Sequence, residues 1–400
     1  MSLEEEKFFV NEYYTYNILF FKLIGISPYK TSSCQMIHIY CFNLIIAIAS
    51  FSQVSVLILS ELKINTLTKL LETALPSFIF ALTYYNFLSK TKIIKAILFR
   101  IKSDWNNMTN KSDLLILKTY ANLGRMCTIL IAIAFYVYIT ILILPSVIHI
   151  ILYIFGVLDE TELILPISID YFLKDQMNFY FALFNEYTYL VVLTTIGIAH
   201  CSIFVSFIQH TCALFNIVAW KIEKGCKGNS HNLYHSYNFI NYDEEYEWII
   251  DVIKSYDNVI DFVDLVKLYH EKICLFEAIF TMLLIILNYI YLFQILSFTI
   301  NMNEVLQKTS YVFGSMFVIY IYHYVGQKLI NHHTEIYIKL CQIPFYKLSL
   351  KTQKILLFMI MKSMMPCNLS VKGVIVLSHY LFGTFMKTSF SYAMIFYSSM

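Results

Sequence analysis

The longest stretch without a charged side chain runs from Tyr187 to Trp220 and covers 34 residues. As a helix it would rise about 50 Å, whereas the hydrocarbon core of a bilayer is about 30 Å thick. We therefore expect this helix to cross a membrane and to continue beyond it. Only 14% of the 400 residues are charged, against about 25% in soluble domains. The sequence predicts an all-α membrane protein, which makes a soluble enzyme remote, and its net charge of +2 implies no nucleic-acid partner.

Uncharged or nearly uncharged runs recur along the chain and predict seven transmembrane helices. They cover residues 37–59, 73–89, 126–158, 180–220, 278–303, 309–327 and the C-terminal stretch 371–400. In this last stretch Lys387 separates two runs, each too short to span a bilayer alone. We expect either a broken terminal helix or one helix with a buried lysine, and favour a last helix split into a cytosolic half and a membrane half, with Lys387 where the membrane half begins.

The basic residues predict the orientation of these helices. Loops 90–125, 221–272 and 328–372 hold 21 of the 29 lysines and arginines. They are expected in the cytosol, with a cytosolic N-terminus and an extracellular C-terminus, the reverse of a G-protein-coupled receptor. The predicted organisation is a cytosolic N-terminal segment (1–36), six transmembrane helices with cytosolic extensions (37–340), and a cytosolic anchor segment with the split seventh helix (341–400). The acidic, amphipathic stretch 242–271 is expected to be a cytosolic helix that packs on neighbouring helices.

Polar clusters that would support catalysis or metal binding are few. The nine cysteines form no C-x-x-C pair and show no metal-ligand spacing. His332, His333 and Glu335 are the one histidine-rich cluster, and we interpret it as a solvated helix end. Glu277 is interpreted as an interfacial carboxylate at the cytosolic entry of the fifth span. The sequence therefore predicts no enzyme, no metal and no cofactor.

Aromatic residues crowd the middle and outer halves of several predicted spans. Most such side chains pack against other helices or lie at the membrane interface. Some of them could instead line an apolar pocket suited to a small volatile ligand. The candidates are Phe78, Phe135, Tyr138, Phe184, Tyr187, Tyr291, Tyr311 and Phe313.

Hydroxyl side chains recur at near-helical spacing in the last helix, at Thr384, Thr388, Ser391 and Ser398. A stripe of this kind can line a water-filled pore. It can equally support close packing between helices. The spacing by itself leaves both alternatives open.

Five short motifs in fixed order mark the last part of the chain. They are Tyr324-Val325-Gly326-Gln327-Lys328-Leu329-Ile330, Glu335-Ile336-Tyr337, Ile343-Pro344-Phe345-Tyr346-Lys347-Leu348-Ser349, Lys354-Ile355-Leu356-Leu357-Phe358-Met359-Ile360 and Lys387-Thr388-Ser389-Phe390-Ser391-Tyr392. In order and spacing they resemble the insect odorant receptors, a family of seven-helix olfactory receptors. The family usually has Trp where this chain has Phe345.

The resemblance implies a ligand-gated, nonselective cation channel in the plasma membrane of sensory neurons. It implies a heterotetramer with a shared co-receptor, a small volatile odorant as ligand, and an odorant pocket in the outer half between spans two and six. It assigns Ser391 to the pore, Ile395 to the hydrophobic gate, and Ser398 and Ser399 to the outer constriction.

The resemblance also places the anchor that holds subunits together at the cytosolic ends of the helices, here with Phe345 and Tyr346. The loop between the fourth and fifth spans lacks the long insertion typical of the co-receptor, so the chain resembles an odorant-tuning subunit.

Two other receptor classes are alternatives. A gustatory-type channel would end in Gln-Phe where this chain has Ser398-Ser399. A G-protein-coupled receptor would usually show Asp-Arg-Tyr after the third span and Asn-Pro-x-x-Tyr in the seventh, and neither motif occurs in the sequence.

Overall fold

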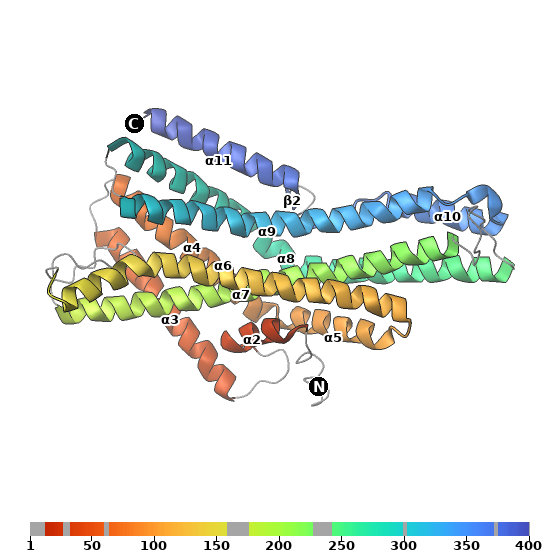
Figure 1. The fold of residues 1–400 in the computed structure, drawn as a ribbon, viewed down its shortest axis with the longest axis horizontal. Coiled ribbons are helices and arrows are strands. Elements are labelled where there is room, and N and C mark those ends of the chain that lie inside the picture. Colours follow the sequence, from red (N-terminus) through yellow and green to blue (C-terminus); the bar gives the residue numbers. More distant parts are fainter. Residues whose placement is uncertain are drawn as a thin grey trace.

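The computed structural model describes residues 13–26, 33–59, 64–157, 176–226, 242–298, 302–371 and 375–399. These residues are nearly all helical (Figure 1). The elements are α2 (Thr15–Leu23), α3 (Ser33–Leu59), α4 (Ile64–Ser89), α5 (Thr91–Asn107), α6 (Lys111–Ile154), α7 (Gln176–Cys226), α8 (Tyr242–Phe298), α9 (Met302–Cys341), η2 (Phe345–Lys347), α10 (Leu350–Ser363), β1 (Ser370–Val371), β2 (Ile375–Val376) and α11 (His379–Ser399). The all-helical expectation is confirmed within the described residues.

Helix α7 lies at the centre of the molecule, beside α6 and α9 (Figure 1). In the most apolar stretch of α7, 94% of the residues are buried, whereas in that of α6 only 28% are. Hydropathy does not explain this difference, since α6 is the more apolar of the two; α7 is buried because α6 and α9 both pack on it. The longest uncharged run of the sequence is therefore the central element of the fold.

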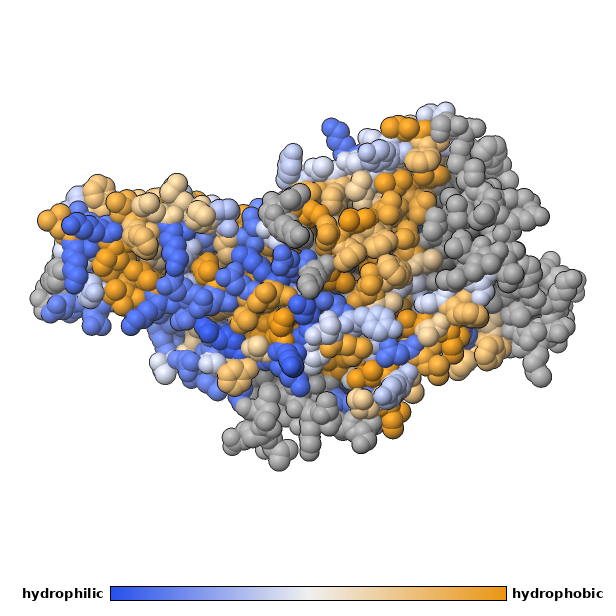
Figure 2. Space-filling view, turned by 180° about the vertical axis from the view of Figure 1, so that it is seen from behind, coloured by the Kyte–Doolittle hydropathy of each residue, from blue (hydrophilic) through white to orange (hydrophobic). Residues whose placement is uncertain are grey.

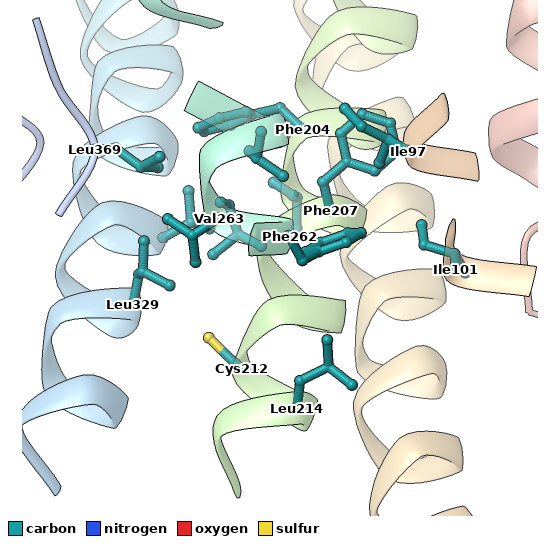
Figure 3. Packing of buried hydrophobic residues seen from close by; sticks show 14 of the residues in the cluster. Ile97, Ile101, Phe204, Phe207, Cys212, Leu214, Phe262, Val263, Leu329 and Leu369 are labelled. Atoms are coloured by element: carbon teal, nitrogen blue, oxygen red, sulfur yellow. The ribbon is translucent and has the colours of Figure 1, made fainter. Parts of the chain in front are cut away.

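The core brings together helices that are distant in sequence. Figure 3 shows Ile97 and Ile101 of α5 facing Phe204 and Phe207 of α7, with Phe262 of α8 between them. These side chains are almost fully buried. The acidic first half of α8 packs into this core, which confirms the predicted helix over 242–271.

Helices α7, α8 and α9 continue well past the uncharged runs that predict them. They contain 51, 57 and 40 residues respectively. The fourth uncharged run thus lies within a single helix that continues past both of its ends. Helix α6 ends at Ile154, four residues before the predicted end of its span, because Gly156 adopts a left-handed φ of +70°. The Gly156 and Val157 amides bond back to Tyr153 O and Leu152 O, which closes the helix in a Schellman motif.

The C-terminal stretch is divided before Lys387 and not at it. Helix α10 ends at Ser363, the strands β1 and β2 form an antiparallel hairpin, and α11 then begins at His379. The Leu381 amide donates to Ser378 Oγ, so Ser378 caps the start of α11. Lys387 lies exposed inside α11, so the helix does not break at this residue, and its position at the membrane entry stays a prediction.

Within the described residues, α6 and the 179–225 part of α7 are long and apolar enough to cross a membrane. Helix α8 would be a third if its two segments, bent by 53°, count as one span. Apolar side chains gather on the half of the surface that holds α11, and hydrophilic ones are more frequent toward the narrow end that holds α10 (Figure 2).

Candidate functional site

A cavity of about 640 Å³ lies between α4, α6, α7, α8 and α9. These helices carry the predicted spans two to six, among which the resemblance places an odorant pocket. The walls are mainly aliphatic and aromatic side chains, as is usual for small-molecule sites. Leu377, which lies between β2 and α11, and Phe385, within α11, also line the cavity. A ligand in this space would therefore touch the last helix.

Two glycines set the shape of the cavity. A Cβ on Gly197 of α7 would lie 2.7 Å from Phe80 and 2.8 Å from Phe135, and one on Gly314 of α9 would lie 2.7 Å from the Tyr138 ring. Non-bonded carbons normally approach to about 3.5–4.0 Å. The rings thus lean against glycine backbone, and this leaves the space in front of them open. Sequence reasoning missed these positions, because a glycine in an apolar run carries no sign of what packs against it.

A polar cluster forms one part of the cavity wall. His200 Nε2 of α7 lies 2.9 Å from Glu277 Oε1 of α8. Thr83 Oγ1 of α4 donates to the same carboxylate oxygen over 3.2 Å, and His200 Nδ1 lies 3.1 Å from Tyr269 Oη. Glu277 is therefore not an interfacial carboxylate, and that expectation was wrong. Its partner is more than 70 residues away in sequence, so only the packing of α7 on α8 brings the two together.

The predicted pocket residues are divided between the cavity and other places. Phe135, Tyr138 and Phe313 line the cavity. Phe78 instead packs edge-to-face on Phe280, Phe184 is exposed, and Tyr187 donates to Ser146. The side chains of Tyr291 and Tyr311 lie outside the described part of the structure.

The predicted pore residues lie on the open face of α11. Ser391, Ile395 and Ser398 are exposed, as are Thr384 and Lys387. These five positions follow a spacing of three and four residues and so share one side of the helix. Ser391 Oγ bonds to Lys387 O and Ser398 Oγ to Ile395 O, within the helix itself. The side chain of Ser399 is not described.

The opposite side of α11 packs against the protein. Ser389 and Ala393 have no exposed surface, and Phe390 makes edge-to-face contacts with Tyr289 and Phe293 of α8. Phe385 lies edge-on to His323 of α9, beside the cavity. One helix thus presents one face to the cavity and to α8 and leaves another uncovered.

The predicted anchor residues Phe345 and Tyr346 are 62% and 71% exposed, and their rings meet edge-to-face at 6.1 Å. Next to them, Ser349 caps α10 and is itself fixed to the buried Glu245 of α8, whose carboxylate accepts from Ser349 N at 3.0 Å and from Ser349 Oγ at 2.9 Å. Exposed apolar residues continue along α10. They are Leu350, Leu357, Phe358 and Met361. Their exposure makes this end of the protomer an apolar surface.

The pair His332 and His333 is not a solvated helix end. His333 is 4% exposed and shares a 3.0 Å hydrogen bond with Tyr256 of α8, while His332 faces Tyr120 of α6. The prediction was wrong because α9 continues to Cys341, so both histidines lie inside the helix and not at its end. Burial, with a smaller contribution from Lys267, lowers the pKa of His333 from 6.5 to about 4.

Acid is expected to destabilise the protein through His333. This imidazole stays neutral in the folded chain until about pH 4 but takes up a proton near pH 6.5 when unfolded. The unfolded state binds more protons in that window, so stability rises with pH there and is lost as the pH falls from about 6.5 toward 4. The full contribution should be about 1–2 kcal/mol after allowance for solvent screening.

Thermal melts of purified protein at pH 7 and pH 5 measure this dependence. Replacing His333 with Gln, which keeps a hydrogen-bonding group for Tyr256, should reduce the acid-induced loss. The exposed His379, replaced in the same way, is the control and should leave the loss unchanged. Equal acid sensitivity in wild type and His333→Gln would contradict the assignment.

An apolar cavity among long helices, in contact with the terminal helix, defines a helical membrane receptor for small molecules. The 7tm Odorant receptor family model matches residues 63–390. The chain belongs to the odorant receptor family.

Two solved structures share the fold. The olfactory receptor OR5 of Machilis hrabei in complex with eugenol aligns with a TM-score of 0.73 and 9% identity, over 100% of this chain and 99% of that one. The same receptor in a second structure aligns with a TM-score of 0.71 and 10% identity, over 96% of each chain. No curated protein matches the sequence.

Proposed function

We propose that this chain is the odorant-binding subunit of a ligand-gated, nonselective cation channel. The observation that carries the proposal is the 640 Å³ apolar cavity that reaches Phe385 of the terminal helix. Its ligand is a small volatile molecule, of the size and character of the eugenol bound by the Machilis receptor. Membership of the odorant receptor family supports the same conclusion.

Gating follows from the position of the cavity. A ligand shifts a conformational equilibrium only through its different affinity for the two states. The cavity wall includes Leu377 and Phe385, so a change in the seating of α11 changes the ligand's contacts. The uncovered face of α11, with Ser391, Ile395 and Ser398, then lines the ion path, and Ile395 closes it.

The channel is a heterotetramer with an odorant co-receptor in the plasma membrane of sensory neurons. The exposed apolar surface of η2 and α10, which includes Phe345 and Tyr346, supports a subunit contact at this end. A monomeric soluble protein rarely exposes such a patch. The basic loops support a cytosolic position for that end and for the N-terminus, with the C-terminus outside.

Whole-cell recording tests the proposal. Cells express this chain alone, or together with an insect odorant co-receptor, and receive a panel of volatile molecules. Odorant-evoked cation current that requires both chains is the expected result. Confirmed surface expression of both chains without any evoked current across a broad panel would count against it, as would a response carried by a G-protein pathway without direct current.

Replacing Ile395 with Ala should raise the current that flows without odorant several-fold. Alanine removes most of the apolar side chain that Ile395 places at the pore axis, so the closed pore admits water and ions more easily. The measurement is basal current per unit of surface protein in co-receptor-expressing cells. Phe396→Ala is the matched control, because Phe396 is also exposed but lies on the side of α11 that holds Ser389 and Ala393, and it should keep the wild-type basal current. An unchanged leak in well-expressed Ile395→Ala would remove Ile395 from the gate.

A further inference from the structure

Three potential metal ligands converge beside the cavity, from two helices. One ring nitrogen each of His200 and His270 and a carboxylate oxygen of Glu277 lie within 4.8 Å of one another. Ligand atoms in a tetrahedral zinc site are about 3.4 Å apart, since each bond is about 2.0–2.1 Å long. A small rotation of one side chain therefore brings all three within bonding distance of a common centre.

The nitrogens of His270 have no other use in the described structure. The residue is 3% exposed, and among the described residues neither ring nitrogen has a hydrogen-bond partner. The imidazole stacks on Phe204, at a centroid distance of 4.2 Å, and lies nearly parallel to Tyr322, at 5.6 Å, and these two rings are themselves 5.2 Å apart. Burying an unpaired polar group costs about 1–3 kcal/mol. A rigid, buried imidazole without partners therefore indicates a ligand that the protein itself does not supply.

His200 is oriented as a metal ligand would be. Its Nε2 lies 2.9 Å from Glu277 Oε1 but is not aligned with it for a hydrogen bond. Its Nδ1 lies 3.1 Å from Tyr269 Oη. When Nδ1–H donates to this hydroxyl, the lone pair of Nε2 faces the cluster. A second partner of this kind is the usual companion of a metal-bound histidine, because it fixes the tautomer and the ring plane.

We propose that His200, His270 and Glu277 form a binding site for a divalent transition-metal ion of the zinc class. Two imidazoles and one carboxylate are a known three-ligand set for zinc, with the fourth position left to water or another ligand. All three residues line the cavity, so that position is available from the ligand side. Magnesium and calcium are poor candidates because they prefer oxygen ligands.

The site joins the two segments of α8 that meet at its bend, and it joins both of them to α7. Helix α8 bends by 53° between its segments Asp243–Glu271 and Leu275–Ile290. His270 lies before this bend and Glu277 after it, while His200 belongs to α7. A bound ion therefore fixes the bend of α8 against α7, and the second segment of α8 is the one that packs on α11.

Cobalt(II) is a suitable probe because four-coordinate Co²⁺ has visible absorption bands that six-coordinate aqueous Co²⁺ largely lacks. The full-length chain, purified in detergent, is titrated with Co²⁺ alone. We expect one equivalent per chain to produce these bands and Zn²⁺ to abolish them. His200→Gln and His270→Gln should each weaken Co²⁺ binding about tenfold or more, and Tyr269→Phe about 10–100-fold through the lost orientation of His200.

The matched control is His323→Gln, which removes another buried histidine from the same cavity wall but not from the cluster. It should keep the wild-type Co²⁺ affinity. Thermal melts with and without Zn²⁺ show whether each variant is folded, and the ion should raise the melting temperature of wild type and of His323→Gln only.

Folded wild type without Co²⁺ bands, or His270→Gln with wild-type affinity, would overturn the metal site. This outcome is separable from the proposed channel function. A wild-type chain that binds no Co²⁺ but gives odorant-evoked current would reject the metal site alone, and a wild-type chain that binds Co²⁺ but gives no current would reject only the channel.

Discussion

Replacing Gly326 with Ala should sharply reduce the amount of folded receptor at the cell surface. A Cβ at this position of α9 would lie 2.4 Å from the carbonyl oxygen of Leu377 and 2.5 Å from its Cβ. Because the obstacle is backbone, a side-chain rotation does not relieve the clash. Overpacking of this kind costs about 1–3 kcal/mol, enough to change cellular abundance several-fold.

The clash falls where the terminal helix joins the rest of the protein. Next to Gly326, Gln327 Oε1 accepts a hydrogen bond from the amide of His379, the first residue of α11, over 3.2 Å. Pushing Leu377 away from α9 would disturb this contact and the start of α11. Any receptor that still reaches the surface should therefore respond more weakly to odorant.

The matched control is Gly383→Ala in α11, because a Cβ there would meet no described atom within 4 Å outside the adjacent backbone of its own helix. Alanine is favoured over glycine inside a helix by about 0.5–1 kcal/mol, so this variant should be at least as stable as wild type. Surface biotinylation and thermal melts of both variants provide the comparison. Wild-type stability of Gly326→Ala would mean that the hairpin and α9 are farther apart than the structure has them.

Replacing Gly197 with Ala should raise the concentration of a bulky odorant needed for half-maximal current by roughly tenfold or more. The new methyl group would meet the rings of Phe80 and Phe135 at 2.7 and 2.8 Å, and both rings line the cavity. Gly197 and both rings line the cavity, so the added methyl group and the displaced rings change its shape and take up part of its space. One methylene in such a pocket is worth about 1–3 kcal/mol, or 10–200-fold in discrimination.

The dependence on odorant size separates this effect from simple damage to the protein. Small odorants should lose less sensitivity than large ones, because they do not need the space that the rings take up. Gly124→Ala on α6 is the control, since its Cβ would meet Gln209 and Ser206 at an ordinary 3.8 Å. An equal loss for all odorants, or none, would contradict the cavity as the odorant site. Dose–response currents across a homologous series, normalised to surface protein, make the measurement.

The helical elements and their approximate positions could be predicted from the sequence. Uncharged runs mark α3, α4, α6, α7, α8 and α9, because an apolar helix is the form in which a long uncharged chain satisfies its backbone. The predicted ends of these helices were less accurate than their positions. Gly156 closes α6 before its run of apolar residues is over, and the break before α11 depends on a hairpin that neither charge nor hydropathy marks.

Only part of the candidate site could be predicted from the sequence. Phe135, Tyr138 and Phe313 belong to the predicted pocket set and line the cavity, but aromatic residues in a membrane helix have the same signature whether they line a cavity or pack on a neighbour. Phe78 and Phe184 illustrate this, since nothing in their sequence surroundings separates them from the other three. The role of α11 as pore and of Ile395 as gate remains a prediction.

The sequence by itself determined that the chain is an all-helical membrane protein of the odorant receptor kind, because hydropathy and short ordered motifs are local properties. Only the tertiary structure decided that α7 is the central helix, that His333 is buried against Tyr256, and that Glu277 meets His200 with His270 nearby. Each of these depends on which face of one helix meets which face of another. That choice is made by side-chain packing between residues from different helices, which a pattern along one helix does not record.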